Sequence, residues 1–364
     1  MNIFPDITNL EEFKANVGDI PGIEFITVPG GYTIASYYIL DSKVFQNPYA
    51  RECRGITFDK NGDLVSRPLH KFFNLGERES TLEKNIDWST LTTVMDKRDG
   101  SMISPVLLED GSIKFKTKRS FTSDPAVLVN NTFGPDSAQY KMSQRLCSIG
   151  CTPIFEITSP NNRIVVSYKE TELVLLAVRK NQSGNYFSRD QLELLASEWN
   201  IPIVDTFTDV TISDLKHSAE TQTGIEGWVV QFNTGEMIKL KTAWYLSLHG
   251  SVTFTTEKNI AEMVIDETID DFKSYCTSVG DTELFDKVVA IETRVNNTLS
   301  EIIDDVNRTV ETCGIEQGQF KEFALTYTDH PYFWLLMMKF KGQTPLYGKY
   351  FLTNHLHEYS RECI

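Results

Sequence analysis

The sequence lacks any apolar run long enough to cross a membrane. The longest run, around residues 334–338, is far shorter than the roughly 20 residues that a transmembrane helix needs. The first six residues contain neither a basic leader nor an apolar core, so they do not resemble a signal peptide. We therefore expect a soluble, cytoplasmic protein without a membrane partner.

Cysteine is also scarce, and none of it forms a metal-binding pattern. The six cysteines are spread over 364 residues without a C-x-x-C pair. Cys147 and Cys151 are four residues apart, but neither a second pair nor a flanking histidine accompanies them. Reduced structural thiols are the expected role.

Basic residues are in deficit, and the deficit is uneven. The chain has 35 Lys and Arg against 50 Asp and Glu, a net charge of −15, which argues against a general nucleic-acid binder. Residues 254–364 hold 19 acids and 10 bases, whereas the first 253 residues hold 25 of the 35 bases. A locally positive groove with few phosphate contacts therefore fits only the first part of the chain.

Two hydrophobic patterns divide the chain. From residue 32 to about 250, short strands and hairpin turns such as Asn61-Gly62 dominate, and Ser188 with Gln191 predicts a capped helix start. From Thr256 onward apolar residues recur at intervals of three and four, as in helices. We expect an α+β fold in which antiparallel sheets with helices fill residues 1–250, and an all-helical domain fills 251–364.

The stretch 97–101 supplies a candidate nucleophile. The β-branched and apolar residues 91–95 predict a strand that leads into Lys97, and Asp99-Gly100 predicts a turn before the next strand. A lysine amine has a reference pKa of about 10.4, so nucleophilic attack requires desolvation or neighbouring cations. The alternative, which these five residues leave open, is a solvated lysine in a hairpin.

Four further polar clusters occur in strand-like contexts. They are residues 51–58, 67–74, 155–157 and 226–241. Glu156 is the single carboxylate of an apolar run, and Lys239 and Lys241 share one face of a predicted strand. Two ammonium groups on one face repel each other unless an anion lies between them or the face is exposed to solvent. The run 114–119 alternates like a strand with one cationic face, which fits either a positive groove or a solvated sheet edge.

The motifs K-x-D-G-S, F-E-I, E-G-W-V-V and K-L-K, in this order, resemble the covalent nucleotidyltransferase superfamily of ATP-dependent ligases and capping enzymes. The stretches 52–55, 71–74 and 241–245 make the finer resemblance to the RNA ligase 1 family of T-even bacteriophages, over about residues 32–250. The resemblance implies an ATP-grasp-like nucleotidyltransferase core. The helical tail agrees, since DNA ligases and capping enzymes usually carry a β-barrel after this core.

The resemblance also implies a reaction and a set of site residues. An ATP-dependent RNA ligase would join 5′-phosphate and 3′-hydroxyl RNA ends through lysyl-AMP and adenylylated RNA. Lys97 would be the nucleophile, Glu226 would lie near it and bind Mg²⁺, and Lys239 and Lys241 would contact phosphates. The residues that match nucleotide-binding positions are Tyr37, Arg54, Lys71, Asp99, Gly100, Lys118, Glu156 and Tyr245.

The implied partners are single-stranded RNA ends, in particular those of cleaved tRNA, which the helical domain would select. The implied enzyme is a monomer in the cytoplasm of the host cell, if a phage encodes it. Two other functions remain open. One is a DNA ligase or capping-type enzyme, which the helical tail disfavours. The other is a non-catalytic assembly module with a decayed ligase fold, which the intact Lys97, Glu156 and Glu226 disfavour.

Overall fold

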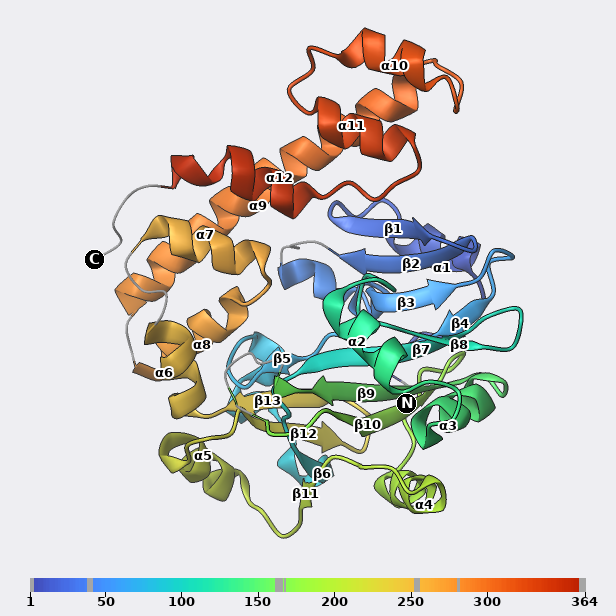
Figure 1. Ribbon diagram of the computed structural model, residues 1–364. Helices are drawn as coiled ribbons and strands as arrows, with labels where there is room; N and C mark the ends of the chain where they lie inside the picture. The colour runs from blue at the N-terminus through green and yellow to red at the C-terminus, as the bar shows by residue number, and fades with distance from the viewer. Residues whose placement is uncertain are drawn as a thin grey trace. The chain divides into compact units, whose positions relative to one another are not determined.

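The computed structural model describes residues 3–37, 42–160, 166, 168–251, 256–279 and 282–359. It contains two compact units (Figure 1). Met1–Tyr37 and Asp41–His249 form the first unit, and Gly250–Ile364 belongs to the second. The predicted α+β class is confirmed, since the first unit contains largely antiparallel sheets and the named elements that the structure describes in the second unit are helices.

The first sheet consists of four antiparallel strands in chain order. They are β1 (Ile23–Val28), β2 (Tyr32–Tyr37), β3 (Arg54–Phe58) and β4 (Leu64–Ser66). The predicted turn at Asn61-Gly62 joins β3 to β4, and Gly62 adopts the positive φ of 85° that favours glycine. The helix α1 (Leu10–Val17) precedes this sheet, and the side chain of Asn9 caps its first turn.

The second sheet has the strand order β10-β9-β7-β8 and is antiparallel throughout. Its strands are β7 (Ser101–Leu107), β8 (Ile113–Lys116), β9 (Cys151–Thr158) and β10 (Glu172–Lys180). The helices that cover it are α2 (Asp124–Thr132), α3 (Ala138–Cys147) and α4 (Arg189–Trp199). Phe115, Phe155 and Leu173 are fully buried between sheet and helices. The capping box predicted at Ser188 and Gln191 begins α4.

The third sheet has the order β11-β6-β12-β13-β5, and only its β13–β5 pair is parallel. Its strands are β5 (Phe73–Asn74), β6 (Leu91–Asp96), β11 (Thr206–Phe207), β12 (Gly227–Phe232) and β13 (Met237–Lys241). The helix α5 (Ile212–Thr221) packs against this sheet through Leu215 and Ala219, and α6 (Ala243–Ser251) follows β13 in the chain. Short 3₁₀ turns complete the unit, at η1 (Ser42–Gln46), η2 (Ala50–Glu52), η3 (Glu79–Thr81), η4 (Glu83–Asn85) and η5 (Trp88–Thr90).

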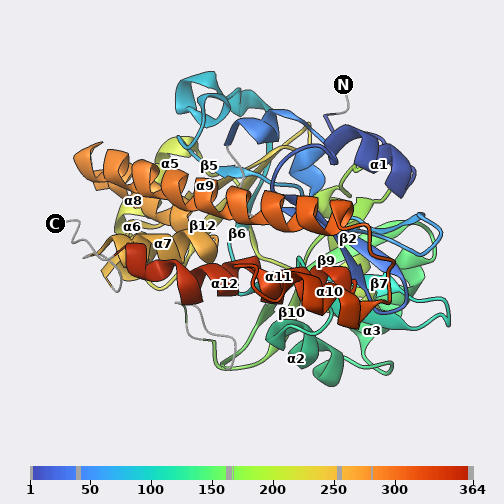
Figure 2. The same cartoon turned by 90° about the horizontal axis from the view of Figure 1, so that it is seen from above.

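The second unit packs around one long helix, α9 (Thr282–Thr312). Its other elements are α7 (Glu257–Ile265), α8 (Ile269–Val279), α10 (Phe320–Tyr327), α11 (Phe333–Phe340), α12 (Tyr347–Asn354) and η7 (Leu356–Glu358). Figure 2 shows α11 and α12 running alongside α9, as their contacts require. The predicted apolar stripe is confirmed, since Val288, Val295 and Val306 of α9 are fully buried.

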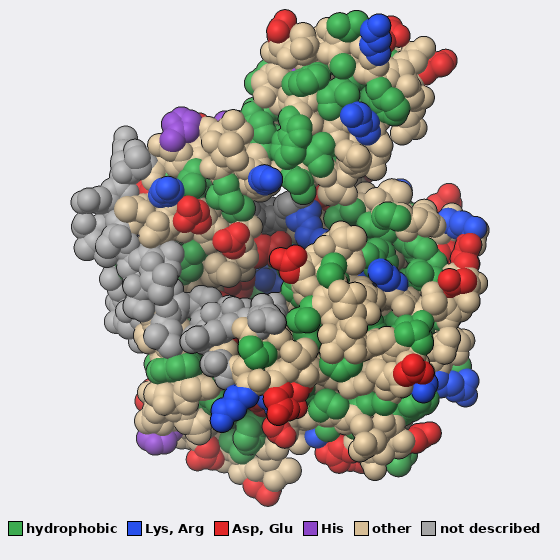
Figure 3. Space-filling model, viewed as in Figure 1, with side chains coloured by type: hydrophobic (Ala, Val, Ile, Leu, Met, Phe, Trp, Pro, Cys, Tyr) green, Lys and Arg blue, Asp and Glu red, His purple; other side chains and the backbone are tan. Residues whose placement is uncertain are grey.

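The surface of the second unit is partly apolar. Figure 3 shows apolar side chains at the surface around α10 and α11, where Phe320, Leu325 and Trp334 are exposed. None of the helices in the described parts of the chain combines the length and the apolar content that crossing a bilayer requires.

Candidate active site

Lys97 lies where the chain leaves one sheet and enters another. The strand β6 before it belongs to the five-stranded sheet, whereas β7 after it belongs to the second sheet. The chain bends at Asp99-Gly100 as predicted, but β6 and β7 do not pair with each other, so the hairpin alternative is wrong. The backbone N–H of Lys97 donates to the carbonyl of Gly227 at 2.9 Å, which fixes Lys97 beside the start of β12.

Glu226 lies between two lysines. The Nζ atoms of Lys97 and Lys241 each lie 2.7 Å from the same oxygen, Oε1 of Glu226. Burial tends to raise the pKa of Glu226, but the ammonium groups of Lys241 and Lys97 outweigh it and lower the pKa. Glu226 is therefore ionised, and two cations around one anion leave a positive field at this point.

Gly227 permits the close strand approach that brings Lys241 to Glu226. In the β12–β13 pair, Gly227 lies opposite Lys241. A Cβ atom on Gly227 would lie 2.1 Å from the carbonyl oxygen of Leu240, and its φ of 147° is unfavourable for other residues. A side chain at this position would push the two strands apart and separate the lysine from the carboxylate.

Asp99 anchors the turn that follows Lys97. Its buried carboxylate accepts the hydroxyl of Tyr245 at 2.8 Å and the backbone N–H of Val166 at 2.6 Å. Its own N–H donates to the hydroxyl of Tyr168 at 3.0 Å. Tyr245 is also held beneath Lys241, whose Nζ lies 4.7 Å from the ring centroid. Asp99 and Tyr245 thus belong to the same cluster as the lysines.

Gly100, which directly precedes β7, and Glu156, which lies on β9, complete this cluster. A Cβ atom on Gly100 would lie 2.3 Å from the carbonyl oxygen of Ile157, so only glycine allows the turn to rest on β9. Burial raises the pKa of Glu156 to about 8, against the opposing effect of Lys97. The carboxyl group is therefore largely protonated at neutral pH and can donate a hydrogen bond.

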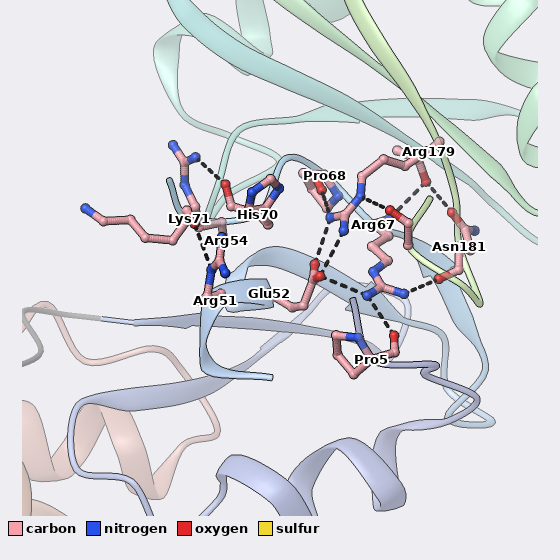
Figure 4. Close-up of polar contacts among 12 residues, drawn as sticks. Pro5, Arg51, Glu52, Arg54, Arg67, Pro68, His70, Lys71, Arg179 and Asn181 are labelled. Carbon is pink, nitrogen blue, oxygen red and sulfur yellow. Dashed lines mark hydrogen bonds and ion pairs between the residues drawn. The ribbon is translucent and has the colours of Figure 1, made fainter. Parts of the chain in front are cut away.

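Arg54 and Lys71 lie on neighbouring segments. The Nη1 atom of Arg54 donates to the carbonyl of His70 at 3.0 Å, and Figure 4 shows both cations beside this residue. The Nζ atom of Lys71 lies 5.3 Å from the ring centroid of Phe73 and 5.6 Å from that of Phe45.

The remaining predicted residues are Lys118, Tyr37 and Lys239. Lys118 and Tyr37 form a pair of their own, with the lysine Nζ 3.8 Å from the ring centroid. Lys239 lies on β13 two residues before Lys241, half-buried and opposite Val229. Alternation along the strand therefore places both lysines on one face, as the sequence predicts.

The cationic run 114–119 behaves in a way that neither sequence interpretation anticipated. Lys116 is fully buried at the end of β8, and its Nζ donates to the carbonyl of Gly55 at 2.6 Å. Burial lowers the pKa of Lys116 to about 7. The prediction of a solvated edge face is therefore wrong for this lysine. The alternation of residues along a strand cannot identify a buried lysine, because it does not show which face of the strand packs against another sheet.

A buried ion network that the sequence did not suggest supports the segments that carry Arg54 and Lys71. The carboxylate of Glu52 accepts Arg67 at 2.8 Å and Arg179 at 2.7 and 2.8 Å (Figure 4). All three side chains are almost completely inaccessible. Burial alone would raise the pKa of Glu52, but Arg179 and Arg67 hold it far below its usual range. The partners lie too far apart in sequence for local patterns to reveal them.

Glu226 fits a Mg²⁺ ion that binds together with the phosphates of a substrate. Among the described residues, no three His, Cys, Asp or Glu side chains converge as a preformed metal site. Mg²⁺ usually binds through one or two carboxylates, substrate phosphates and waters. Glu226, which is ionised, can supply a carboxylate oxygen, and substrate phosphates and waters would supply the other ligands.

Comparison with known proteins identifies the family. The family model for T4-type RNA ligases, described as RNA ligase, matches residues 52–245. A candidate RNA ligase of Thermovibrio ammonificans is 27% identical over 336 residues, which are 90% of this chain and 85% of that protein. RNA ligase 1 of bacteriophage TS2126 is 26% identical over 225 residues, 60% of this chain and 56% of that one.

The fold agrees with a solved structure. An archaeal ATP-dependent RNA ligase superposes with a TM-score of 0.51 at 10% identity, over 83% of this chain and 79% of that one. Since the family model covers more than half of the chain, the protein belongs to the T4 RNA ligase 1 family.

Proposed function

We propose that Lys97 is the nucleophile of a three-step RNA sealing reaction. In the first step its neutral amine attacks the α-phosphorus of ATP. A P–N bond forms, the bond to the β-phosphate oxygen breaks, and pyrophosphate leaves while the amine loses a proton to solvent. The observation that carries this proposal is the single Glu226 oxygen shared by the Nζ atoms of Lys97 and Lys241, each at 2.7 Å.

Glu226 and Lys241 prepare this attack. Glu226 aims the lysine amine by accepting its hydrogen bond, and Lys241 contacts the same carboxylate oxygen from the other side. Lys241 then faces the charge that develops on the α-phosphate oxygens. Such preorganised cations act mainly by electrostatic stabilisation of the transition state.

The remaining cluster residues hold the nucleoside. Glu156 in its protonated form would donate a hydrogen bond to a ribose oxygen. Asp99 and Gly100 hold the turn in place. Tyr245 would contact the nucleotide, and so would Lys118 and Tyr37, which match family positions near it. These assignments rest on the contacts of Asp99 and Tyr245 and on the match to the family motifs.

Lys241 contacts Glu226 beside the nucleophile, so we assign it to the α-phosphate. The phosphates beyond the α position would then be bound by Arg54, Lys71 and Lys239. Mg²⁺, held by the phosphate oxygens and Glu226, would supply further neutralisation of their charge. The protein residues orient the triphosphate so that pyrophosphate leaves in line with the attacking amine.

In the second step an oxygen of an RNA 5′-phosphate attacks the AMP phosphorus, breaking the P–N bond and giving adenylylated RNA. In the third step a 3′-hydroxyl attacks the RNA 5′-phosphorus and AMP leaves. We infer that the natural substrates are single-stranded RNA ends, in particular those of cleaved tRNA, and that the helical unit selects among them. This inference rests on the resemblance to the phage ligases and on the separate core of that unit.

The test is the covalent intermediate. Protein incubated with ATP labelled in the α-phosphate and Mg²⁺ should retain label after denaturation, and it should transfer that label to RNA with a 5′-phosphate. Lys97→Ala should retain none, yet it should still seal RNA that is already adenylylated. Label on denatured Lys97→Ala protein would show that another residue is the nucleophile, and label from GTP instead of ATP would indicate a capping-type reaction.

A further inference from the structure

Arg51 connects three separate segments of the first unit. Its guanidinium forms a two-pronged contact with Glu236, from Nη1 to Oε1 at 2.6 Å and from Nη2 to Oε2 at 2.5 Å. Its Nε donates to the carbonyl of Lys71 at 3.2 Å, and its own carbonyl accepts the N–H of Lys71 at 2.7 Å. Arg51 lies in η2, Lys71 in the loop before β5, and Glu236 immediately before β13.

These three segments carry all of the cations that we assign to ATP phosphates outside the nucleophile itself. Arg54 begins β3, directly after η2. Lys71 lies in the second segment. Lys239 and Lys241 lie on β13, three and five residues after Glu236. Figure 4 shows Arg51 close to both Arg54 and Lys71.

The contact differs from an ordinary surface ion pair. The side chain of Arg51 is only 18% exposed, and all of its guanidinium nitrogens are used. Burial opposes ionisation of Glu236, but the neighbouring His70 and Arg51 hold its pKa at about 2. Burial also lowers the pKa of His70 to about 4, so His70 is neutral near pH 7 and Arg51 is the cation that faces the carboxylate. A bidentate pair of this kind fixes orientation as well as distance.

We propose that Arg51 and Glu236 are positioning residues, which together form a clamp that sets the spacing between the Arg54–Lys71 cations and the Lys239–Lys241 cations. This inference rests on the proposed function, because it assumes that these cations hold the triphosphate of ATP. Neither Arg51 nor Glu236 needs to touch the nucleotide. The parallel β5–β13 pairing holds the same segments at Asn74 and Lys239. The clamp adds a side-chain contact at the start of β13, where Met237 also pairs with Gln231 of β12.

The clamp should matter most for the reaction with ATP. A displacement of about 1 Å at a group that positions a substrate can cost on the order of a hundredfold in rate. RNA that is already adenylylated carries no pyrophosphate leaving group, so its sealing depends less on the spacing of these cations. A residue needed only for folding would affect both reactions alike.

The experiment compares Arg51→Ala, Arg51→Lys, Glu236→Gln and the Arg51→Ala/Glu236→Gln double variant in the full-length protein. We expect Arg51→Ala and Glu236→Gln each to lower the rate of covalent AMP transfer at limiting ATP by about 10- to 100-fold. Sealing of adenylylated RNA should fall less than threefold. The double variant should lose no more than the worse single variant, because both changes break one interaction. Arg51→Lys should recover part of the rate, since it keeps the charge but not the fork.

Arg189→Ala is the matched control. Arg189 also pairs with a carboxylate, that of Glu193, and donates to a backbone carbonyl, that of Val204, and its side chain is 19% exposed. It lies on α4, away from every cation segment in sequence, and its variant should adenylylate like the wild type.

Three results would overturn the clamp. The first is a wild-type rate of AMP transfer in Arg51→Ala, and the second is a loss in the double variant equal to the product of the two single losses. The third is an equal loss in ATP-dependent adenylylation and in sealing of adenylylated RNA, together with a lower melting temperature. If the wild type itself carried no AMP on Lys97, the proposed function would fail first and the clamp would lose its basis. The two failures are therefore separated by the wild-type measurement alone.

Discussion

The two units of this protein differ in what they bury. The second unit has an apolar core, in which the buried residues of α7 to α12 are aliphatic or aromatic side chains and one cysteine. In the described parts of the chain, every buried charged or histidine side chain belongs to the first unit. They are Glu52, Arg67, His70, Asp99, Lys116, Arg179 and Glu226.

This difference shows how the two units are stabilised. Apolar burial is non-directional, so a helical bundle requires little more than the correct spacing of its apolar residues. A buried charge is unfavourable unless a partner lies at hydrogen-bonding distance, so each one fixes its neighbours in place. The first unit therefore holds its candidate catalytic groups by directional contacts, and its stability depends on single partners.

The largest expected effect is on the stability of the first unit. Arg179→Met removes both of the Arg179 contacts to Glu52 and leaves the carboxylate with Arg67 alone. Breaking a buried ion pair from one side costs about 3–5 kcal/mol. Urea unfolding, followed by tryptophan fluorescence for each unit, should show this loss in the transition of the first unit. A loss below about 1 kcal/mol would mean that the network is not needed for folding.

The second effect concerns catalysis. Lys241→Ala should lower the rate of lysyl-AMP formation roughly a hundredfold or more, since loss of one preorganised charge-stabilising group costs about 2.7–4 kcal/mol. Lys241→Arg should rescue only part of the rate, because a planar fork does not replace a compact ammonium group.

Lys273→Ala in the second unit is the control for this measurement. Lys273 also contacts a glutamate, Glu292, at 2.9 Å, and its side chain is 17% exposed against 5% for Lys241. Its variant should keep the wild-type rate of AMP transfer. A normal rate in Lys241→Ala, or an equal loss in both variants, would contradict the assignment of Lys241.

A smaller effect is expected when the second unit is removed. A protein that ends near Gly250 should still form lysyl-AMP, because all of the assigned site residues precede that position. It should lose about tenfold in its preference for a nicked tRNA over a linear oligonucleotide, which is about 1.4 kcal/mol of discrimination. The sealing rates of both proteins on both RNAs measure this ratio. An unchanged ratio would remove substrate selection from the role of the helices.

The last effect is a pH dependence of stability that Lys116 confers. Its pKa is about 7 in the folded protein, below the unfolded value near 10.4, so the unfolded chain binds more protons between these values. Stability should therefore rise as pH increases from 7 toward 10. Lys116→Met should flatten this rise in urea unfolding measured at pH 7, 8 and 9. An identical slope in wild type and variant would show that Lys116 is not the group responsible.

The sequence predicted the elements of the fold whose signals are local. The turn at Asn61-Gly62, the capped helix at Ser188 and the apolar stripe of α9 follow from residues that are neighbours in the chain. The order of the ligase motifs likewise indicated the family. The separate pairing of β6 and β7 was not predictable, because a turn sequence does not specify whether the next strand joins the same sheet.

The sequence by itself therefore determined the fold class, the helical tail, the family and the candidate nucleophile, because each depends on residue types and short spacings. Only the tertiary structure decided which charges meet. Arg51 and Glu236 lie 185 positions apart, and the Lys97–Glu226–Lys241 contact joins the ends of three strands. The burial of Lys116 also depends on which sheet covers its strand. Such contacts arise from strand order and from the packing of sheets against each other, which local periodicity does not encode.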